Sequence, residues 1–105
     1  MSSSAITKSA LCDSLKKLCE QKPFDKISIS DITGECGLNR QSFYYHFQDK
    51  YELLSYIYLH ELFADITKGV NYDNWYERLE GFLVNMLKDK RFYSNTLKTV
   101  SYTHL

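Results

Sequence analysis

Residues 27–54 read ISISDITGECGLNRQSFYYHFQDKYELL, with helix-capping residues and a glycine between short apolar runs. Ser28 is a good helix N-cap, and Asp31 stands three residues later, where its carboxylate can accept a hydrogen bond from the Ser28 amide. A short helix is therefore expected from Ile29 to about Cys36. Its expected buried positions are Ile29, Ile32 and Cys36. Gly37 follows, and we expect it to end the helix in the left-handed conformation.

A second short helix is expected directly after this glycine. Asn39 is a good N-cap, and the helix it begins runs from Arg40 to about Phe47. Phe43 and Phe47 are four residues apart, so they share one helix face, and we predict that they lie in the core. The opposite face carries Arg40, Gln41, Ser42 and Tyr44. Two short helices joined by a glycine-containing turn have the layout of a helix-turn-helix.

The flanking sequence predicts further helices. An amphipathic pattern runs from Ala5 to about Lys22 and stops before Pro23. Asp49 can cap another helix, with Glu52 at the capping-box position, that continues to about Lys68. Two more helices are expected, from about Asp73 to Lys88 and from Asp89 onward. Their expected apolar positions are Trp75, Leu79, Phe82, Leu83, Met86 and Leu87 in the first, and Phe92, Leu97 and Val100 in the second.

These patterns predict an all-α protein. Residues 1–48 are expected to form a three-helix bundle that contains the helix-turn-helix. Residues 49–105 are expected to begin a helical regulatory domain, with the helix after Asp49 linking the two parts. At 105 residues the chain is long enough for one modest core.

Composition excludes several classes of function. Thirteen basic and thirteen acidic residues cancel, so any DNA binding must come from local placement of charge. Three cysteines without a CxxC pair indicate a reduced, cytoplasmic protein, and no signal peptide or membrane span is visible. His46, His60 and His104 are scattered, so no metal site, no cofactor site and no enzyme activity is predicted.

The second helix of the quoted stretch has the chemistry of a DNA-reading surface. No acidic residue stands between Cys36 and Gln48, as a phosphate-lined groove requires. Arg40 can donate to guanine O6 and N7, and Gln41 can pair with adenine N6 and N7. Such a basic-polar face is also common on solvated helices of proteins that bind no DNA. For Tyr44 and His46, the residues alone leave hydrogen-bonded packing and phosphate contact equally open.

The quoted stretch resembles the TetR/AcrR family of bacterial transcriptional regulators. The resemblance covers about residues 6–62. It rests on the aspartate-isoleucine of the first short helix, the glycine turn, the Phe-Tyr-Tyr-x-Phe block at 43–47 and the Lys-x-x-Leu-Leu block at 50–54. The segment from Arg40 to Tyr44, with Trp75 and residues 89–97, looks like the subgroup of dihydroxyacetone-kinase regulators.

The resemblance implies a sequence-specific DNA-binding regulator that acts as a homodimer on a double-stranded, pseudo-palindromic operator. It implies base reading by Arg40, Gln41 and Ser42. It implies contacts to the DNA backbone by Ser28, Asn39, Tyr44, Tyr45, His46 and Lys50. A small-molecule effector or a co-regulator protein would act on the C-terminal part. The alternative is a module of the same fold that binds protein and does not use DNA.

The family's dimerisation region is a longer C-terminal helical domain. We interpret the 105 residues as an N-terminal fragment of such a protein, and expect this form to dimerise poorly and to bind an operator weakly.

Overall fold

The regular elements in residues 3–103 are all helical, which confirms the predicted all-α class. The computed structural model describes these residues, and their side chains except those of Asp65, Thr67 and residues 100–103. In chain order the elements are α1 (Ser3–Cys19), η1 (Phe24–Lys26), α2 (Ile29–Glu35), α3 (Arg40–His46), α4 (Lys50–Ile57), η2 (Tyr58–Leu62), α5 (Ala64–Thr67), α6 (Trp75–Lys88) and α7 (Lys90–Thr103).

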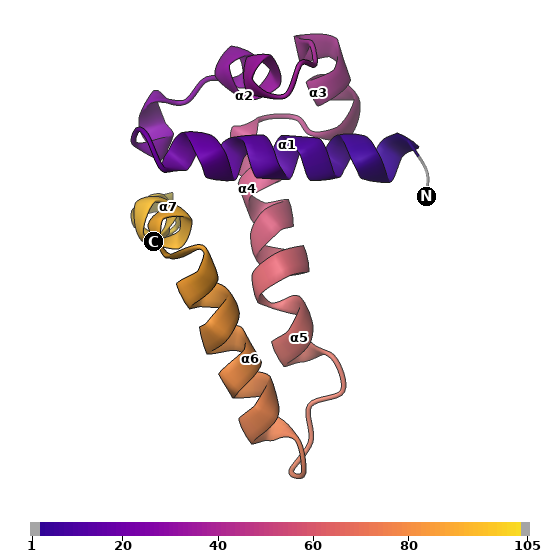
Figure 1. Ribbon diagram of the computed structural model, residues 1–105, viewed down its shortest axis with the longest axis vertical. Helices are drawn as coiled ribbons and strands as arrows, with labels where there is room; N and C mark the ends of the chain where they lie inside the picture. The colour runs from indigo at the N-terminus through magenta and orange to yellow at the C-terminus, as the bar shows by residue number, and fades with distance from the viewer. Residues whose placement is uncertain (1–2, 104–105) are drawn as a thin grey trace.

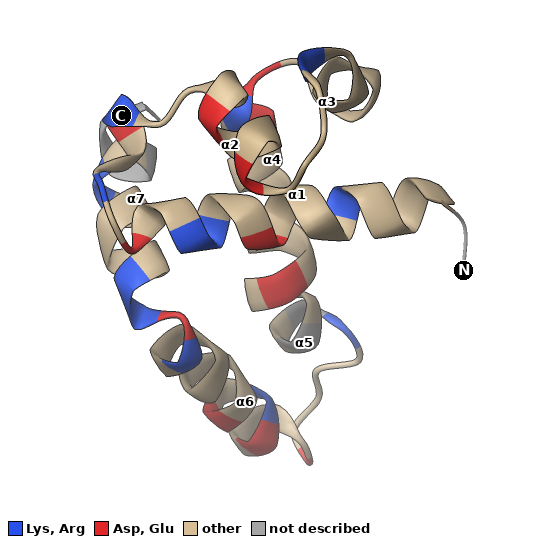
Figure 2. Ribbon diagram, turned by 45° about the horizontal axis from the view of Figure 1, so that its top comes forward, with Lys and Arg blue, Asp and Glu red and all other residues tan. Residues whose placement is uncertain are grey.

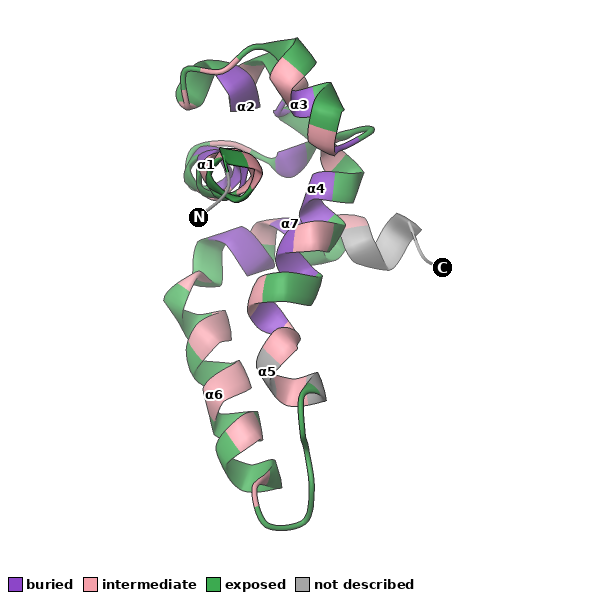
Figure 3. Cartoon of the chain, turned by 90° about the vertical axis from the view of Figure 1, so that its right-hand side faces the viewer, coloured by how far each residue is buried: buried purple, intermediate pink, exposed green. Residues whose placement is uncertain are grey.

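α1 is the element around which the N-terminal half is built. α2 and α3 lie along one side of it, whereas α4 crosses it and leads to the other side, where α6 and α7 lie (Figure 1). The face of α1 that carries Leu11 and Leu15 is fully buried, as are Ile32 of α2, Phe43 of α3 and Leu53 of α4. Figure 3 shows buried stretches in each of the four helices α1, α2, α3 and α4. One core therefore holds the helix-turn-helix on α1.

The turn between α2 and α3 is a complete Schellman motif, the helix ending that uses a left-handed residue. Gly37 has φ of 71°. The Leu38 amide donates to Thr33 O at 2.9 Å, and the Gly37 amide donates to Gly34 O at 3.4 Å. Because these bonds satisfy the last carbonyls of α2, the turn can redirect the chain sharply into α3.

The expected long helix after Asp49 is interrupted. α4 ends at Ile57 and continues through the π-helical turn η2, in which the Phe63 amide donates to Tyr58 O at 2.9 Å. Tyr58 and Leu62, the first and last residues of this turn, are both buried. The Tyr58 hydroxyl lies 2.7 Å from Thr96 Oγ1 of α7. A pattern of 3.6-residue period cannot reveal such a π-helical turn.

The apolar face of α6 is less buried by the rest of the protein than the sequence pattern predicts. Phe82 packs against the core and stacks on Phe63, with ring centroids 5.7 Å apart, and Met86 is also partly buried. The rest of the expected stripe is exposed, namely Trp75, Leu79, Leu83 and Leu87. The apolar face is thus wider than the contact that η2 and α5 offer.

α7 fits its prediction in part. Phe92 is buried as expected, but Leu97 is exposed and Thr96 takes the buried position. Val100 lies outside the described side chains. No helix in the described part of the chain is both long and apolar enough to span a bilayer.

Two glycines of the turn region provide a matched test of this geometry. An added Cβ meets nothing within 4 Å at either Gly34 or Gly37, but only Gly37 has a positive φ. We expect Gly37→Ala to lower the free energy of unfolding by about 1 kcal/mol, because an L-residue is strained in the left-handed region. Gly34→Ala should raise it by about 0.5–1 kcal/mol, because Gly34 lies inside a helix. Urea denaturation of both variants measures these changes, and equal effects would contradict the assigned turn.

Candidate nucleic-acid interface

Two buried aromatic rings fix the orientation of α3. Phe43 is 0% exposed and Phe47 is 4% exposed, which confirms the prediction that both lie in the core. Their ring centroids are 5.8 Å apart, and Phe47 meets the Tyr56 ring of α4 edge-on at 5.5 Å. Since both rings point inward, the opposite face of this two-turn helix must face solvent.

The outward face begins at a well-formed cap. Asn39 Oδ1 accepts a hydrogen bond from the Ser42 amide at 2.8 Å, as its sequence position predicts. Directly after the cap, Arg40 and Gln41 are exposed and Ser42 is half-buried. Figure 2 shows that α3 carries no acidic residue, in contrast to α2. The first turn of α3 therefore presents donors and amide groups without carboxylates beside them.

Arg40 and Tyr44 form a pair along α3. Arg40 Nη2 donates to Tyr44 Oη at 3.3 Å, and the guanidinium carbon lies 5.8 Å from the Tyr44 ring centroid. Tyr44 is 48% exposed and rests edge-on against Phe43. The buried Phe43 thereby supports Tyr44, which in turn supports the guanidinium of Arg40.

The other side of α3 borders a shallow groove of about 270 Å³. Tyr45, which is 84% exposed, lies edge-on to His46 with ring centroids 5.0 Å apart. Thr7 of α1 also lines this groove, and sequence reasoning missed it. The sequence feature that points to Thr7 is its position on α1, one helical turn before the buried Leu11. The lining residues are Thr7, Asn39, Gln41, Ser42, Tyr45 and His46.

Ser28 lies apart from α3, at the start of α2. Its Oγ accepts from the Asp31 amide at 3.0 Å, and Asp31 Oδ2 accepts from the Ser28 amide at 3.0 Å. This is the capping box that the sequence predicts. The Lys22 ammonium also donates to Asp31 Oδ2 at 2.9 Å. The hydrogen bond from the Ser28 amide, followed by the one from Lys22, lowers the pKa of Asp31 to about 2.

Lys50 has a structural contact that the sequence does not reveal. Its ammonium donates to Phe24 O and Ile27 O at 2.9 Å each and to Asp25 O at 3.4 Å. It also lies 4.6 Å from the Phe24 ring centroid. Burial lowers its pKa, partly offset by the nearby Asp25 carboxylate. All three N–H bonds point into the protein here, so a phosphate contact by Lys50, which stays a prediction, would require it to give up at least one of them.

The remaining candidates for chemistry are structural. Burial raises the pKa of the Cys12 and Cys19 thiols to about 12 in each case, so both stay protonated and unreactive at neutral pH. Within residues 3–103, no group of three or more His, Cys, Asp or Glu side chains is placed to hold a metal ion. His104 lies outside the described residues.

Comparison with known proteins points to gene regulation. The family described as "Bacterial regulatory proteins, tetR family" matches residues 11–57, from the middle of α1 to the end of α4. This is a family of regulators and not of enzymes, in agreement with the prediction made from the sequence.

The similar proteins include two curated relatives and a solved structure. The HTH-type dhaKLM operon transcriptional activator DhaS of Lactococcus lactis is 31% identical over 93 residues, covering 89% of this chain and 50% of that protein. The transposon Tn10 TetC protein of Escherichia coli is 31% identical over 84 residues, covering 77% of this chain and 43% of that protein. The solved structure of a dihydroxyacetone kinase operon activator DhaS superposes with a TM-score of 0.76 at 29% identity, covering 89% of this chain and 52% of that one. The chain thus spans about half the length of these proteins.

Truncating Phe47 tests how α3 is held. We expect Phe47→Ala to lower the free energy of unfolding by about 3–5 kcal/mol, as is usual for a buried phenylalanine. Tyr45→Ala, two residues earlier on the exposed side, should change it by less than about 0.5 kcal/mol. Thermal melts report both, with Phe47→Leu as a milder variant that keeps the chain folded. An unchanged melting temperature for Phe47→Ala would show that the ring is not part of the core.

The Asp31 carboxylate provides a test at low pH. Because its pKa is lowered in the folded protein, its stabilising effect is present above the ordinary value of 3.8 and is lost as the pH falls through about 2. The melting-temperature difference between wild type and Asp31→Asn should therefore shrink from pH 5 to pH 2. An NMR titration of the Asp31 carboxyl should have its midpoint near 2, and Lys22→Ala should raise that midpoint. A wild-type midpoint near 4 would contradict the capping box.

Proposed function

Residues 11–57 place this chain in the tetR family of bacterial regulatory proteins, and on that premise we propose that it binds operator DNA as a transcriptional regulator through α3. The outward face of α3 is the observation that carries the proposal. Arg40 and Gln41 are exposed at the start of the helix, whereas Phe43 and Phe47 anchor its other side. A short helix held in this way can lie in the major groove of B-DNA.

Base reading is assigned to the first turn of α3. The planar guanidinium of Arg40 can donate to both guanine acceptors, and the Gln41 amide can pair with adenine in the same groove. Ser42 lies beside them and can donate from its hydroxyl. The Tyr44 contact at 3.3 Å holds Arg40 along the helix before DNA arrives, which lowers the entropy lost on binding.

Backbone contacts are assigned to groups around this helix. The Nδ2 of Asn39 and the hydroxyl of Ser28 can donate to phosphates while their oxygens keep the caps of α3 and α2. Tyr45 and His46 border the groove beside Gln41, so they can reach the strand next to the base that it reads. The full set is Ser28, Asn39, Tyr44, Tyr45, His46 and Lys50.

The regulator would act as a homodimer in the cytoplasm. Two copies of α3 would enter successive major grooves of a pseudo-palindromic operator, about one helical turn apart. Residues 1–48 would form the DNA-binding domain and residues 49–105 the start of the regulatory and dimerisation domain, with α4 linking them. The similarity to activators of a dihydroxyacetone kinase operon supports a role in that kind of regulation, with a small-molecule effector or a co-regulator protein as the signal.

A protein-interaction module of the same fold is the competing function. The zero net charge and the exposed apolar residues of α6 favour it. Salt separates the two functions. DNA binding weakens steeply as ionic strength rises, because neutralised phosphates release counterions, whereas an apolar interface is insensitive to salt.

Arg40 allows a direct test of base reading. The probes are a duplex selected from a random-sequence pool for binding to this chain and a scrambled duplex of the same composition. Arg40→Ala should cost about 1–3 kcal/mol on the selected duplex and relax the preference at one base pair. Arg91→Ala is the matched control, because it removes an exposed arginine from α7, away from α3, and should leave the preference intact.

Titrations at several salt concentrations measure both variants. An equal loss for Arg40→Ala on both duplexes would make Arg40 a phosphate contact. A wild-type chain that binds neither duplex at low salt would overturn the proposed function.

A further inference from the structure

The chain between α1 and α2 is held by side chains from two distant elements. We call residues 20–28 the corner segment. It leaves the C-terminal end of α1, passes through Pro23 and η1, and ends at the N-cap of α2. Because Pro23 has no amide hydrogen and α1 has ended, the carbonyl groups at this corner lack the partners that a continuing helix would provide.

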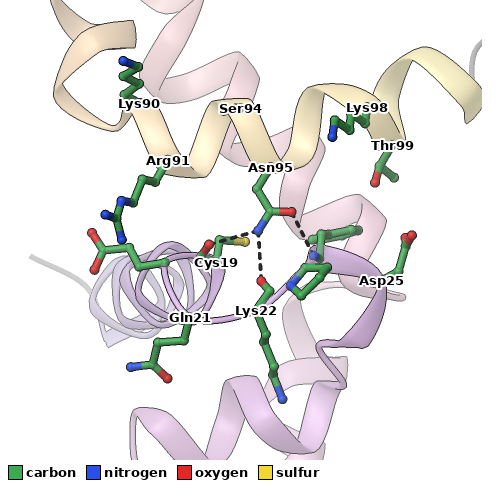
Figure 4. A pocket seen from close by; sticks show the side chains of 13 residues that line it. Cys19, Gln21, Lys22, Asp25, Lys90, Arg91, Ser94, Asn95, Lys98 and Thr99 are labelled. Carbon is green, nitrogen blue, oxygen red and sulfur yellow. Dashed lines mark hydrogen bonds between the residues drawn. The ribbon is translucent and has the colours of Figure 1, made fainter.

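Asn95 of α7 supplies those partners from one side. Its Nδ2 donates to Cys19 O and to Lys22 O, at 3.0 Å each, and its Oδ1 accepts from the Phe24 amide at 3.0 Å. Figure 4 shows all three bonds converging on this one side chain. Both protons of its amide nitrogen are used, so Asn95 fits the corner with no donor left over. The sequence separations of 71 to 76 residues make this a contact between opposite ends of the chain.

Lys50 holds the same segment from the other side. Its ammonium donates to Phe24 O and Ile27 O. The backbone N–H of Phe24 is therefore bound by α7 and its C=O by α4. The Phe24 ring is 1% exposed and meets the Tyr51 ring of α4 edge-on at 5.5 Å. Lys50 is the first residue of α4, directly after the loop that leaves α3. The corner segment is thus the shared neighbour of α7 and of the start of α4.

The end of the corner segment also fixes α2. Ser28 caps α2, and Lys22 reaches forward to Asp31 in its first turn at 2.9 Å. A shift of the corner segment therefore moves the start of α2. It also moves the ammonium of Lys50, which is the first residue of α4. α3 lies between these two elements in the chain, so its placement depends on both.

We propose that Asn95 is a positioning residue for DNA binding, which couples the placement of α7 to that of α2 and α3 through the corner segment. This inference rests on the proposed function of α3. Displacement of α7 by a signal in the C-terminal part would release Cys19 O, Lys22 O and the Phe24 amide together. A groove of about 620 Å³ lies beside Asn95, so water can take over these groups once the side chain leaves (Figure 4).

The experiment compares three variants of the full chain. Asn95→Leu removes all three hydrogen bonds, and Asn95→Gln keeps both functional groups on a longer side chain. Thr96→Val is the matched control, because it breaks the neighbouring bond from α7 to Tyr58, at 2.7 Å, without touching the corner segment. Affinity is measured on the selected and scrambled duplexes. Amide hydrogen exchange is followed at Phe24, with Leu15 in the core as the reference for global unfolding.

We expect Asn95→Leu to weaken binding to the selected duplex about tenfold, within the 5- to 150-fold range typical of coupled sites. Exchange at Phe24 should accelerate at least as much relative to Leu15. Asn95→Gln should fall between Leu and wild type in both measurements. Thr96→Val should lower the melting temperature but leave the affinity and the relative Phe24 exchange unchanged.

Three outcomes would overturn the inference. One is an affinity for Asn95→Leu equal to that of wild type. Another is an equal loss of affinity in Asn95→Leu and Thr96→Val, since the loss would then follow general stability. The third is unchanged Phe24 exchange in Asn95→Leu. In each of these cases wild type still binds DNA, so the proposed function survives, whereas a wild-type chain that binds no duplex removes both.

Discussion

The burial of Phe43 and Phe47 is the constraint on which the presentation of α3 depends. A helix of seven residues has too little intrinsic stability to hold itself, so its orientation comes from the side chains that it buries. Both rings enter the core formed with α1 and α4, and this leaves Arg40 and Gln41 no direction except outward. The caps at Ser28 and Asn39 and the left-handed Gly37 set where α2 and α3 begin and how the chain turns between them.

Polar contacts between residues that are far apart in the sequence join the N-terminal helices to the C-terminal helices. Asn95 of α7 and Lys50 of α4 both bind the backbone of the corner segment. Lys16 of α1 pairs with Glu61 of η2 at 2.5 Å and with Asp89 at 3.1 Å. Separating the two partners of such a buried or half-buried contact costs free energy, because each polar group is left without its hydrogen bond. Movement of η2 or of Asp89, between α6 and α7, is therefore felt at α1. Movement of α7 is felt at the corner segment, which leads into α2.

Local signals made most of the fold predictable from sequence. The capping box at Ser28, the caps at Asn39 and Asp49 and the glycine turn depend on residues within a few positions of each other, and all were found where the sequence placed them. The π-helical turn at 58–62 was not predictable, because a 3.6-residue period does not reveal an inserted residue. The Lys50 and Asn95 contacts were not predictable, because they join elements up to 76 residues apart in the chain. The periodicity of apolar residues also predicted which face of α6 is apolar. It does not predict which other element packs on that face. The roles of Arg40, Gln41 and Ser42 stay predictions, since a DNA contact leaves no mark on the free chain.

The most direct test of the account is an NMR titration of the labelled chain with a mixed-sequence 20-base-pair duplex at low salt, with the backbone amides followed one by one. Docking through α3 predicts the largest shifts at Arg40 to His46 and at Ser28, with a smaller response at Phe24 through the corner segment, and reversal of all of them when salt is added. The chemical shifts of the α6 amides should not change. Shifts centred on α6, or shifts that persist at high salt, would contradict the account.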